Sequence, residues 1–197
     1  MIIGVCGKSS SGKSFLASKL CERLNGFKVL SGDAVGHDVI AIEEVKKELV
    51  DAFGDIVLKD GIIDRKALGK IVFNDKNEMN KLNDITGPRM KKIFDNNIEE
   101  GNIIIDWILL SKTEYFDKCD IKILVDIPYE IRLYRAVMRD GITKAKFDER
   151  EKASVTYNKD DFDIVVSIDD EMNMDELLNN ILSRINYKLE LRRHYGY

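Results

Sequence analysis

The part of the sequence best suited to chemistry lies near the amino terminus, where residues 7–14 read Gly-Lys-Ser-Ser-Ser-Gly-Lys-Ser and match the pattern Gly-x-x-x-x-Gly-Lys-Ser/Thr. Glycines permit backbone conformations that larger residues avoid, so successive N–H groups of such a loop converge on phosphate oxygens at a helix N-terminus. Lys13 adds a charge that reaches the β- and γ-phosphates of a nucleotide, and the Ser14 hydroxyl suits the Mg²⁺ shell. The residues expected to bind the phosphates of a nucleotide are Gly7, Ser9, Ser10, Ser11, Gly12, Lys13, Ser14 and Phe15.

Two carboxylates at the ends of apolar runs are candidates for the remaining chemistry. Asp33 follows the run 28–30, and Asp106 ends the run 103–105. Ligands of a parallel α/β sheet collect beyond the carboxyl ends of the strands, so we expect Asp33 to face the same crevice as the phosphate loop. Asp33 can accept the proton of an acceptor hydroxyl, or it can simply cap the helix that follows. Asp106 can hold Mg²⁺ through water, or it can be an ordinary aspartate at a strand end.

Arginines suited to a mobile lid lie further along the chain. Arg139 is on a predicted helix, Arg150 follows beyond Gly141, and the lid is expected over residues 139–160 with Gly141 as its hinge. Arginine forks match phosphate geometry and offset charge in the transition state, so Arg139 and Arg150 are the candidate catalytic arginines. Arg132 and Arg135, on the same helix, are interpreted as solvated or packing residues.

The elements that must position these residues follow from hydrophobic patterning. Short Ile- and Val-rich runs with little alternation indicate strands covered on both faces, hence a parallel sheet. These runs are 2–6, 28–30, 102–107, 121–127 and 163–168. Apolar residues at helical spacing between the runs indicate crossover helices after the loop, up to Gly54, after Pro128, and from Met172 to about Arg193. Residues 41–100 are too many for one crossover, so an inserted substrate-side helical region with a turn at 60–61 is expected there.

Composition limits the possible partners and the number of domains. The 197 residues, 44% of them hydrophobic, suffice for one core and are too few for two full-size domains, so we expect a single domain with an inserted subdomain over 1–197. Lys and Arg total 31 against 35 for Asp and Glu, a net charge of −4 that does not attract nucleic acid. Three cysteines without a Cys-x-x-Cys pair indicate a reducing compartment. We expect a cytoplasmic protein that binds a small molecule and neither nucleic acid nor membrane, and no feature specifies an oligomeric state.

The sequence resembles the dephospho-coenzyme A kinases, a family of P-loop kinases, at motifs well beyond the loop. Residues 31–34 and 37–39 resemble the family's Asp-Ala-Asp and His-Glu-Val segments, and residues 63–75 closely resemble its second signature. Further matches follow in family order at 82–88, at Asp106 with Leu109-Leu110, and at 139–141, so that the resemblance extends from Met1 to about Asp170.

The resemblance implies a P-loop NTPase fold of class α/β: a five-stranded parallel sheet flanked by helices, with the loop strand central, an inserted helical substrate-binding subdomain and a lid. It implies ATP as donor, the ribose 3′-hydroxyl of dephospho-CoA as acceptor, and Asp33 as general base. His37 and Arg65 fall on matched positions and are candidate acceptor-binding residues.

The chain departs from the family pattern mainly on the acceptor side. Thr86-Gly87-Pro88 stands where the family has Thr-His-Pro, Ile108 to Lys112 replaces Pro-Leu-Leu-Phe-Glu, Ser154 replaces a Gln, and the Asn expected after the last strand is missing from 166–169. Phe15 replaces a Thr after the loop serine. Two alternatives therefore stay open: a divergent nucleoside or nucleotide kinase with another acceptor, and an ATP-binding regulator without turnover. Asn158-Lys159-Asp160-Asp161 matches the guanine-reading Asn-Lys-x-Asp pattern of GTPases, but no apolar strand precedes it, so we interpret the match as chance.

Overall fold

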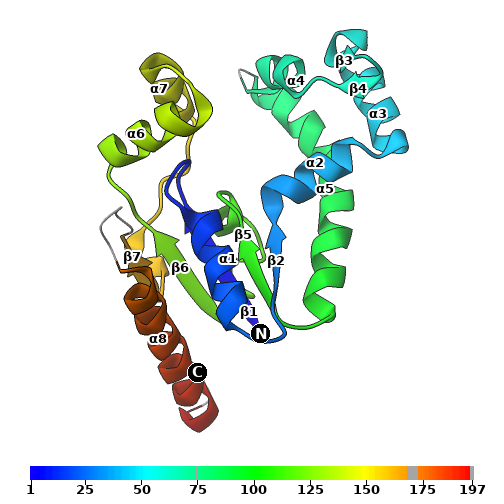
Figure 1. Cartoon of the computed structure of the whole chain (residues 1–197). Coiled ribbons are helices and arrows are strands. Elements are labelled where there is room, and N and C mark those ends of the chain that lie inside the picture. Colours follow the sequence, from blue (N-terminus) through cyan, green and yellow to red (C-terminus); the bar gives the residue numbers. More distant parts are fainter. Residues whose placement is uncertain (74, 168–172, 196–197) are drawn as a thin grey trace. The chain divides into compact units, whose positions relative to one another are not determined.

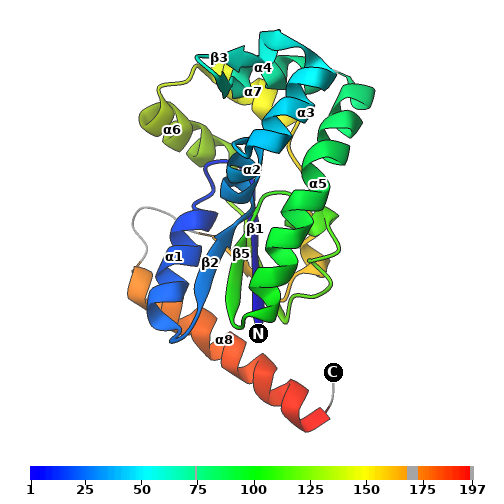
Figure 2. The ribbon, with the colours of Figure 1, turned by 90° about the vertical axis from the view of Figure 1, so that its right-hand side faces the viewer.

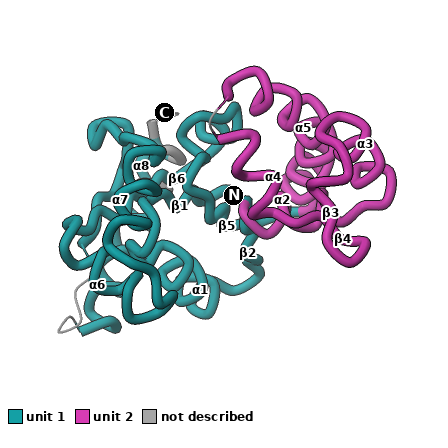
Figure 3. The backbone as a smooth tube through the Cα atoms, turned by 90° about the horizontal axis from the view of Figure 1, so that it is seen from above, with its two compact units in different colours: residues 1–32, 101–197 teal, residues 33–100 magenta. Residues whose placement is uncertain are grey.

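The structure is a computed structural model that describes residues 1–73, 75–167 and 173–195. The chain forms two compact units, which Figure 3 shows in different colours. The first unit comprises residues 1–32 and 101–197, and the second comprises residues 33–100. The chain passes from the first unit to the second between Gly32 and Asp33.

The first unit is built on a parallel sheet of five strands (Figure 1). Its strands in spatial order are β2 (Lys28–Ser31), β5 (Ile103–Asp106), β1 (Ile2–Gly7), β6 (Ile121–Val125) and β7 (Ile164–Val166). Strand β1, which leads into the phosphate loop, is central, and every neighbouring pair is parallel. This confirms the sheet predicted from the five apolar runs, although Ile168, the predicted end of the last strand, lies outside the described residues.

Both faces of the three central strands are covered, whereas Val29 of β2 and Val165 of β7, on the edge strands, are exposed. On one face, side chains of β1, β6 and β7 pack with helices α1 (Lys13–Arg23) and α8 (Met174–Tyr195) in one buried cluster. Figure 2 shows α1 beside the strands and α8 crossing below their lower ends. Residue Met172, where the closing helix was predicted to begin, lies outside the described residues. On the other face, the segment after β5 covers β1: a Cβ on Gly4 would lie 2.8 Å from the Cys119 sulfur and 2.9 Å from Leu110.

The predicted lid region contains two helices of the first unit. Helix α6 (Tyr129–Asp140) follows β6, with Pro128 immediately before its first residue. It ends at Gly141, whose φ of 62° is left-handed, and helix α7 (Lys144–Lys152) begins three residues later. A short 3₁₀ turn at Lys159–Asp161 then leads into β7.

The second unit is mostly helical. Its elements are α2 (Gly32–Ile40), which begins with the last residue of the first unit, α3 (Glu43–Phe53), a 3₁₀ turn (Asp55–Val57), α4 (Arg65–Val72) and α5 (Lys76–Glu99). The predicted turn at Asp60-Gly61 joins the two-stranded antiparallel pair β3 (Leu58–Lys59) and β4 (Ile62–Ile63). Buried side chains from α3, the pair and α4 form its core, among them Leu49, Ile63 and Leu68. The predicted insertion over 41–100 falls inside this unit, and its role on the substrate side is addressed below as a proposal.

Among the helices that the structure describes, none combines the length and the hydropathy needed to cross a bilayer.

Candidate phosphate-binding site

The phosphate loop connects the end of β1 to the start of α1. Gly12 immediately precedes the helix with φ 91° and ψ 10°, a left-handed conformation that glycine adopts without strain. No side-chain hydrogen bond caps this helix, so the N–H groups of its first turn are available to an anion. Gly7 is required by space, because a Cβ there would lie 2.5 Å from the Ser11 hydroxyl oxygen and 2.8 Å from the Val125 carbonyl oxygen. The loop backbone therefore has the geometry that the sequence pattern predicted.

The serines of the loop differ in exposure. Ser14, at the first turn of α1, is exposed, whereas Ser11 is only 1% exposed. The hydroxyl oxygens of Ser10 and Ser11 are buried and lack a hydrogen-bond partner among the residues that the structure describes. Buried hydroxyls without a partner are costly and usually have a functional reason. A phosphate group in the loop is one partner that would suit them.

Lys13 and Asp106 lie together beneath the loop. The Lys13 ammonium is 4.0 Å from a carboxylate oxygen of Asp106, with the lysine side chain 12% exposed and the aspartate side chain 5% exposed. Asp106 ends β5, next to the loop strand, as the sequence predicted. Phe15, by contrast, is 49% exposed at the start of α1, so its ring is open to a ligand or to solvent.

The residues present fit a magnesium ion that arrives with its nucleotide. Within the described part of the chain, no three His, Cys, Asp or Glu side chains are grouped so as to hold a metal ion. Mg²⁺ in kinase sites is bound by one or two protein oxygens together with substrate phosphates and water. The exposed Ser14 hydroxyl and the Asp106 carboxylate match that donor set, and a dedicated protein cage is not required.

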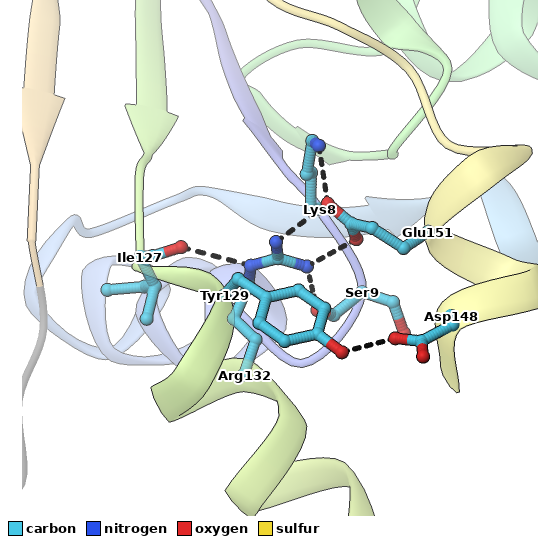
Figure 4. A network of polar contacts seen from close by, with 7 residues as sticks. All are labelled: Lys8, Ser9, Ile127, Tyr129, Arg132, Asp148 and Glu151. Atoms are coloured by element: carbon cyan, nitrogen blue, oxygen red, sulfur yellow. Dashed lines mark hydrogen bonds and ion pairs between the residues drawn. The ribbon is translucent and has the colours of Figure 1, made fainter. Parts of the chain in front are cut away.

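The carboxylate of Glu151 connects α7 with both α6 and the phosphate loop, and Figure 4 shows this network. The Arg132 guanidinium donates to both Glu151 oxygens, at 2.7 and 2.8 Å, and Lys8 of the loop donates to the same carboxylate at 2.6 Å. Arg132 is 3% exposed, and it also donates to the carbonyl oxygens of Ile127 at 3.0 Å and Ser9 at 3.5 Å. The hydrogen bonds from Arg132, followed by those from Lys8, lower the pKa of Glu151 from 4.5 to about 2.

A second contact between α6 and α7 lies one helical turn away from Glu151. The Tyr129 hydroxyl donates to Asp148, and Lys144 pairs with the same carboxylate at 2.8 Å (Figure 4 shows Tyr129 and Asp148). The hydrogen bond from Lys144, followed by that from Tyr129, lowers the pKa of Asp148, and the hydrogen bond to Asp148 raises the pKa of Tyr129. Beneath them the Phe147 ring is 1% exposed, with its edge against Tyr129. Helix α7 is thus held on α6 by one buried ring and two carboxylates.

The two arginines chosen from the sequence lie elsewhere on these helices. Arg139 donates to both oxygens of Asp140, at 2.8 and 3.0 Å, and Arg150 is 3.8 Å from the same carboxylate. The hydrogen bond from Arg139 lowers the pKa of Asp140. It is instead Arg132 and Arg135 that contact the phosphate loop, since Arg135 donates to the Ser11 carbonyl oxygen at 3.5 Å.

Sequence reasoning missed this contact, although a signal for it was present. Strand β6 pairs with β1 so that Val125 lies beside Gly7, and residues that follow two adjacent parallel strands meet at the same sheet edge. The first turns of the helix after β6 must therefore lie near the loop. Arg132 and Arg135 are in those turns, whereas Arg139 is at the far end of the helix.

The predicted acceptor-side residues are in the second unit, where the structure brings two of them together. A guanidinium nitrogen of Arg65 is 3.3 Å from Nδ1 of His37. Arg65 begins α4, whose preceding residue Asp64 accepts hydrogen bonds from the backbone N–H groups of Lys66 and Ala67, and these bonds lower the Asp64 pKa. Asp33 and His37 are four residues apart on α2, which places them on one face of that helix.

Asp33 is in the first turn of α2, one residue after its start at Gly32, and is exposed. The simple capping role considered from the sequence would place Asp33 before the helix. Ser31, two residues earlier, pairs in register with Asp106 at the ends of neighbouring strands. Asp33 is thus two residues along the chain from the strand end that lies beside Asp106.

The Asn-Lys-x-Asp match has a local explanation in the structure. The Asn158 side chain accepts a hydrogen bond from the backbone N–H of Asp160, and Lys159 pairs with Asp126 at 2.5 Å. The strand β7 follows this segment instead of preceding it. Both observations agree with the interpretation of the match as chance.

Comparison with known proteins tests the resemblance. The model of the family described as dephospho-CoA kinase matches residues 1–174. A dephospho-CoA kinase of Fusobacterium nucleatum is 32% identical over 185 residues, which cover 92% of this chain and 95% of that protein. A solved structure of a protein from Thermus thermophilus has a TM-score of 0.80 at 26% identity, covering 96% of this chain and 97% of that one. The fold is also that of the dephospho-CoA kinase from Campylobacter jejuni, with a TM-score of 0.55 at 21% identity over 95% of this chain and 96% of that one. With its phosphate loop intact and a match that runs from the first residue to residue 174, this chain belongs to the dephospho-CoA kinase family.

Proposed function

We propose that the protein transfers the γ-phosphate of ATP to the ribose 3′-hydroxyl of dephospho-CoA, giving CoA and ADP. The observation that carries the proposal is the loop of residues 7–14, in which the left-handed Gly12 opens α1, in a chain whose family membership extends to residue 174. Kinase family membership implies ATP as the phosphate donor. The alternatives of another acceptor and of a regulator without turnover are not favoured by the relatives.

The loop residues perform the donor half of the reaction. The N–H groups that open α1 face the phosphate oxygens, and the ammonium of Lys13 offsets charge on the β- and γ-phosphates. Ser14 would hold Mg²⁺ directly, and Asp106 would hold it through water. When bound, the ion neutralises charge that develops on the phosphate oxygens during transfer. The proximity of Lys13 and Asp106, 4.0 Å apart, supports this assignment.

Asp33 is proposed as the general base for the acceptor. In the transfer step the 3′-oxygen forms a bond to the γ-phosphorus, and the bond from that phosphorus to the bridging oxygen of ADP breaks. The hydroxyl proton passes to the carboxylate of Asp33. His37 and Arg65, whose side chains meet in the second unit, are proposed to hold the acceptor, and residues 33–100 to form the substrate-side subdomain.

Arg139 and Arg150 are retained as the arginines that lid closure would bring to the γ-phosphate. Both side chains are largely exposed and share one carboxylate, Asp140, and exposed ion pairs of this kind are weak. A lid that excludes water would favour transfer over hydrolysis of ATP. We place the reaction in the cytoplasm, in keeping with the three free cysteines and the acidic net charge, with a small molecule as the only substrate partner.

Release of ADP, measured by a coupled assay with dephospho-CoA and with a panel of nucleosides, tests the proposal. We expect turnover that depends on dephospho-CoA. Replacing Lys13 by Ala should weaken ATP binding and transfer, whereas Asp33→Asn should cut transfer by a factor of about 10²–10⁴, the usual contribution of a general base, and leave ATP binding intact.

Matched controls are available on the same helices. Lys19→Ala removes a partly exposed lysine of α1, and Asp38→Asn removes an exposed carboxylate of α2; both should keep the wild-type rate. Transfer to a nucleoside in preference to dephospho-CoA would reject the proposed acceptor. A wild-type rate in Asp33→Asn would reject Asp33 as the base.

A further inference from the structure

We propose that Trp107 is a positioning residue: its indole ring lies against the backbone of Gly32 and fixes the first turn of α2, which carries Asp33. The inference rests on the proposed function, because it takes Asp33 as the general base. Trp107 itself is not proposed to touch either substrate. It acts by holding the segment from which the base projects.

The contact between Trp107 and Gly32 is close. A Cβ built on Gly32 would lie 2.1, 2.3 and 2.5 Å from three carbons of the Trp107 ring, Cγ, Cδ2 and Cδ1. Distances this similar to adjacent ring atoms indicate that Gly32 faces the plane of the ring, because an approach along the ring edge would make them unequal. The indole therefore leaves no room for any side chain at position 32.

Space, and not backbone conformation, is what requires glycine at position 32. Gly32 is absent from the glycines with positive φ in the described residues, which include Gly12 and Gly141. Gly36, four residues later on the same helix, makes the contrast clear: its nearest neighbour would be Met90 Cε at 3.8 Å, an ordinary contact. The restriction thus applies to the first turn of α2 and not to the helix as a whole.

The ring is supported by a firmly held backbone. Trp107 follows Asp106 at the end of β5, and its N–H donates to the carbonyl oxygen of Val5 at 3.3 Å. Its own carbonyl oxygen accepts from the N–H of Leu110 at 3.3 Å, and Leu110 is fully buried. These two hydrogen bonds, one made by the Trp107 N–H and one by its carbonyl oxygen, leave its backbone little freedom to move away from Gly32.

The position of this contact in the chain explains its consequence. Gly32 is the last residue of the first unit, and Asp33 is the first residue of the second. The strand ends that precede the two partners, Ser31 and Asp106, are paired in register. The ring therefore restrains the backbone at the residue that directly precedes Asp33, and the conformation of that backbone sets where the Asp33 carboxylate projects. Displacement of a catalytic group by about 1 Å can cost a factor of roughly 10² in rate.

Four variants test the role: Trp107→Ala, Trp107→Phe, Gly32→Ala, and the double variant Gly32→Ala/Trp107→Ala. We expect Trp107→Ala to lower kcat for transfer by a factor of about 10 or more and to change the KM for ATP by less than about twofold, because the donor site is untouched. Trp107→Phe, which keeps a flat ring, should restore most of the rate. Gly32→Ala should lose a factor of roughly 10² in the wild-type background, but less than about threefold in the Trp107→Ala background, where the added methyl group has room.

Fluorescence gives a readout that does not depend on activity. Trp107 is the only tryptophan in the chain, so all tryptophan emission arises from this ring. Gly32→Ala should shift the emission spectrum, whereas the control Gly36→Ala should leave both the spectrum and kcat as in the wild type. Thermal unfolding of each variant shows whether it is folded at the assay temperature.

The outcomes separate the positioning role from the proposed function. A wild-type kcat in Trp107→Ala, or an equal cost of Gly32→Ala in the two backgrounds, overturns the positioning role. A lowered kcat in Trp107→Ala without rescue by Trp107→Phe also overturns it, because any loss of packing would give the same result. If Gly32→Ala does not fold, the comparison of Trp107→Ala with Trp107→Phe decides alone.

The role of Asp33 is tested separately by Asp33→Asn. A normal transfer rate in that variant rejects Asp33 as the base, whatever the tryptophan variants show.

Discussion

Replacement of Glu151 by Gln should destabilise the protein, because it leaves a buried guanidinium without its counter-charge. Arg132 is 3% exposed and donates to both Glu151 oxygens, and Lys8 shares the same carboxylate. Glutamine keeps the size of the side chain and one oxygen, so that the change removes charge with little loss of packing. The expected result is a lower free energy of unfolding at neutral pH.

The lowered pKa of Glu151 gives the magnitude. A fall from 4.5 to about 2 corresponds to roughly 3 kcal/mol at about 1.4 kcal/mol per pH unit. Loss of one partner of a buried pair costs about 3–5 kcal/mol in general. The Glu151 side chain is 21% exposed and that of Lys8 is 32% exposed, so solvent reduces the effect, and we expect a loss of about 2–3 kcal/mol.

The sign of the pH dependence follows from the direction of the pKa change. A carboxyl group with a lowered pKa in the folded state contributes stability that is fully present above its unfolded value of 4.5 and is lost as pH falls towards about 2. The difference between the wild type and Glu151→Gln should therefore be constant above about pH 5 and should narrow as the pH is lowered to 3.

Urea unfolding at pH 7 and at lower pH, followed by circular dichroism, measures the difference directly. Glu149→Gln, the same change at an exposed position on the same helix, is the matched control and should have no effect. Hydrogen exchange in α7 shows whether that helix opens before the rest of the unit. Wild-type stability of Glu151→Gln at pH 7, together with unchanged exchange in α7, would refute the reasoning. Replacing the pair with Glu151→Leu and Arg132→Met should cost less than either change alone, because no buried charge is then left unpaired; Lys8, which also loses its carboxylate partner, is 32% exposed and can be solvated.

Three further changes have definite expected results. Gly7→Ala should abolish nucleotide binding in a calorimetric titration, because the methyl group would meet Ser11 and a backbone oxygen; normal affinity would contradict the tight loop geometry. Phe147→Ala should weaken the packing of α7 on α6 by about 3–5 kcal/mol, which would appear as faster amide exchange in α7. Unchanged exchange would show that the Phe147 ring does not hold the helix. Burial raises the pKa of Cys6 and of Cys119 to about 12, so both thiols should resist a maleimide at pH 8 until the protein is unfolded, and rapid labelling of either in the native state would contradict the packing.

The parallel sheet could be predicted because its signal is local. Each of the five strands is a short apolar run that can be recognised without knowledge of its neighbours. The three central strands are almost wholly buried, and the edge strands β2 and β7 keep the same composition although Val29 and Val165 are exposed. The phosphate loop is local too, since its glycines and lysine are adjacent in sequence. The order of the strands in the sheet depends on contacts between distant parts of the chain, so no single run reveals it. The expectation that β1 is the central strand came from the family resemblance.

The arginines illustrate what a pattern of spacing does not contain. Arg132, Arg135 and Arg139 all lie on one predicted helix, and nothing in their spacing shows which of them comes near the phosphate loop. The structure separates them by their distance along α6 from the sheet edge, and it buries Arg132 against Glu151, which is 19 residues away. A buried arginine needs a carboxylate partner, but the sequence offers many carboxylates, so the pairing becomes visible only when α7 is packed on α6.

The same distinction applies to the glycines around the site. Gly12 is needed for its backbone conformation, a property of the residue itself, so that a loop motif can reveal it. Gly4 and Gly32 are needed because Cys119 and Trp107 occupy the space of their missing side chains, and those neighbours are 115 and 75 residues away in the chain. No local pattern encodes such a requirement. It follows that the residues which hold a catalytic group in place are harder to find from sequence than the group itself: Asp33 is recognisable in its motif, whereas the ring that restrains its neighbour becomes apparent only in the folded chain.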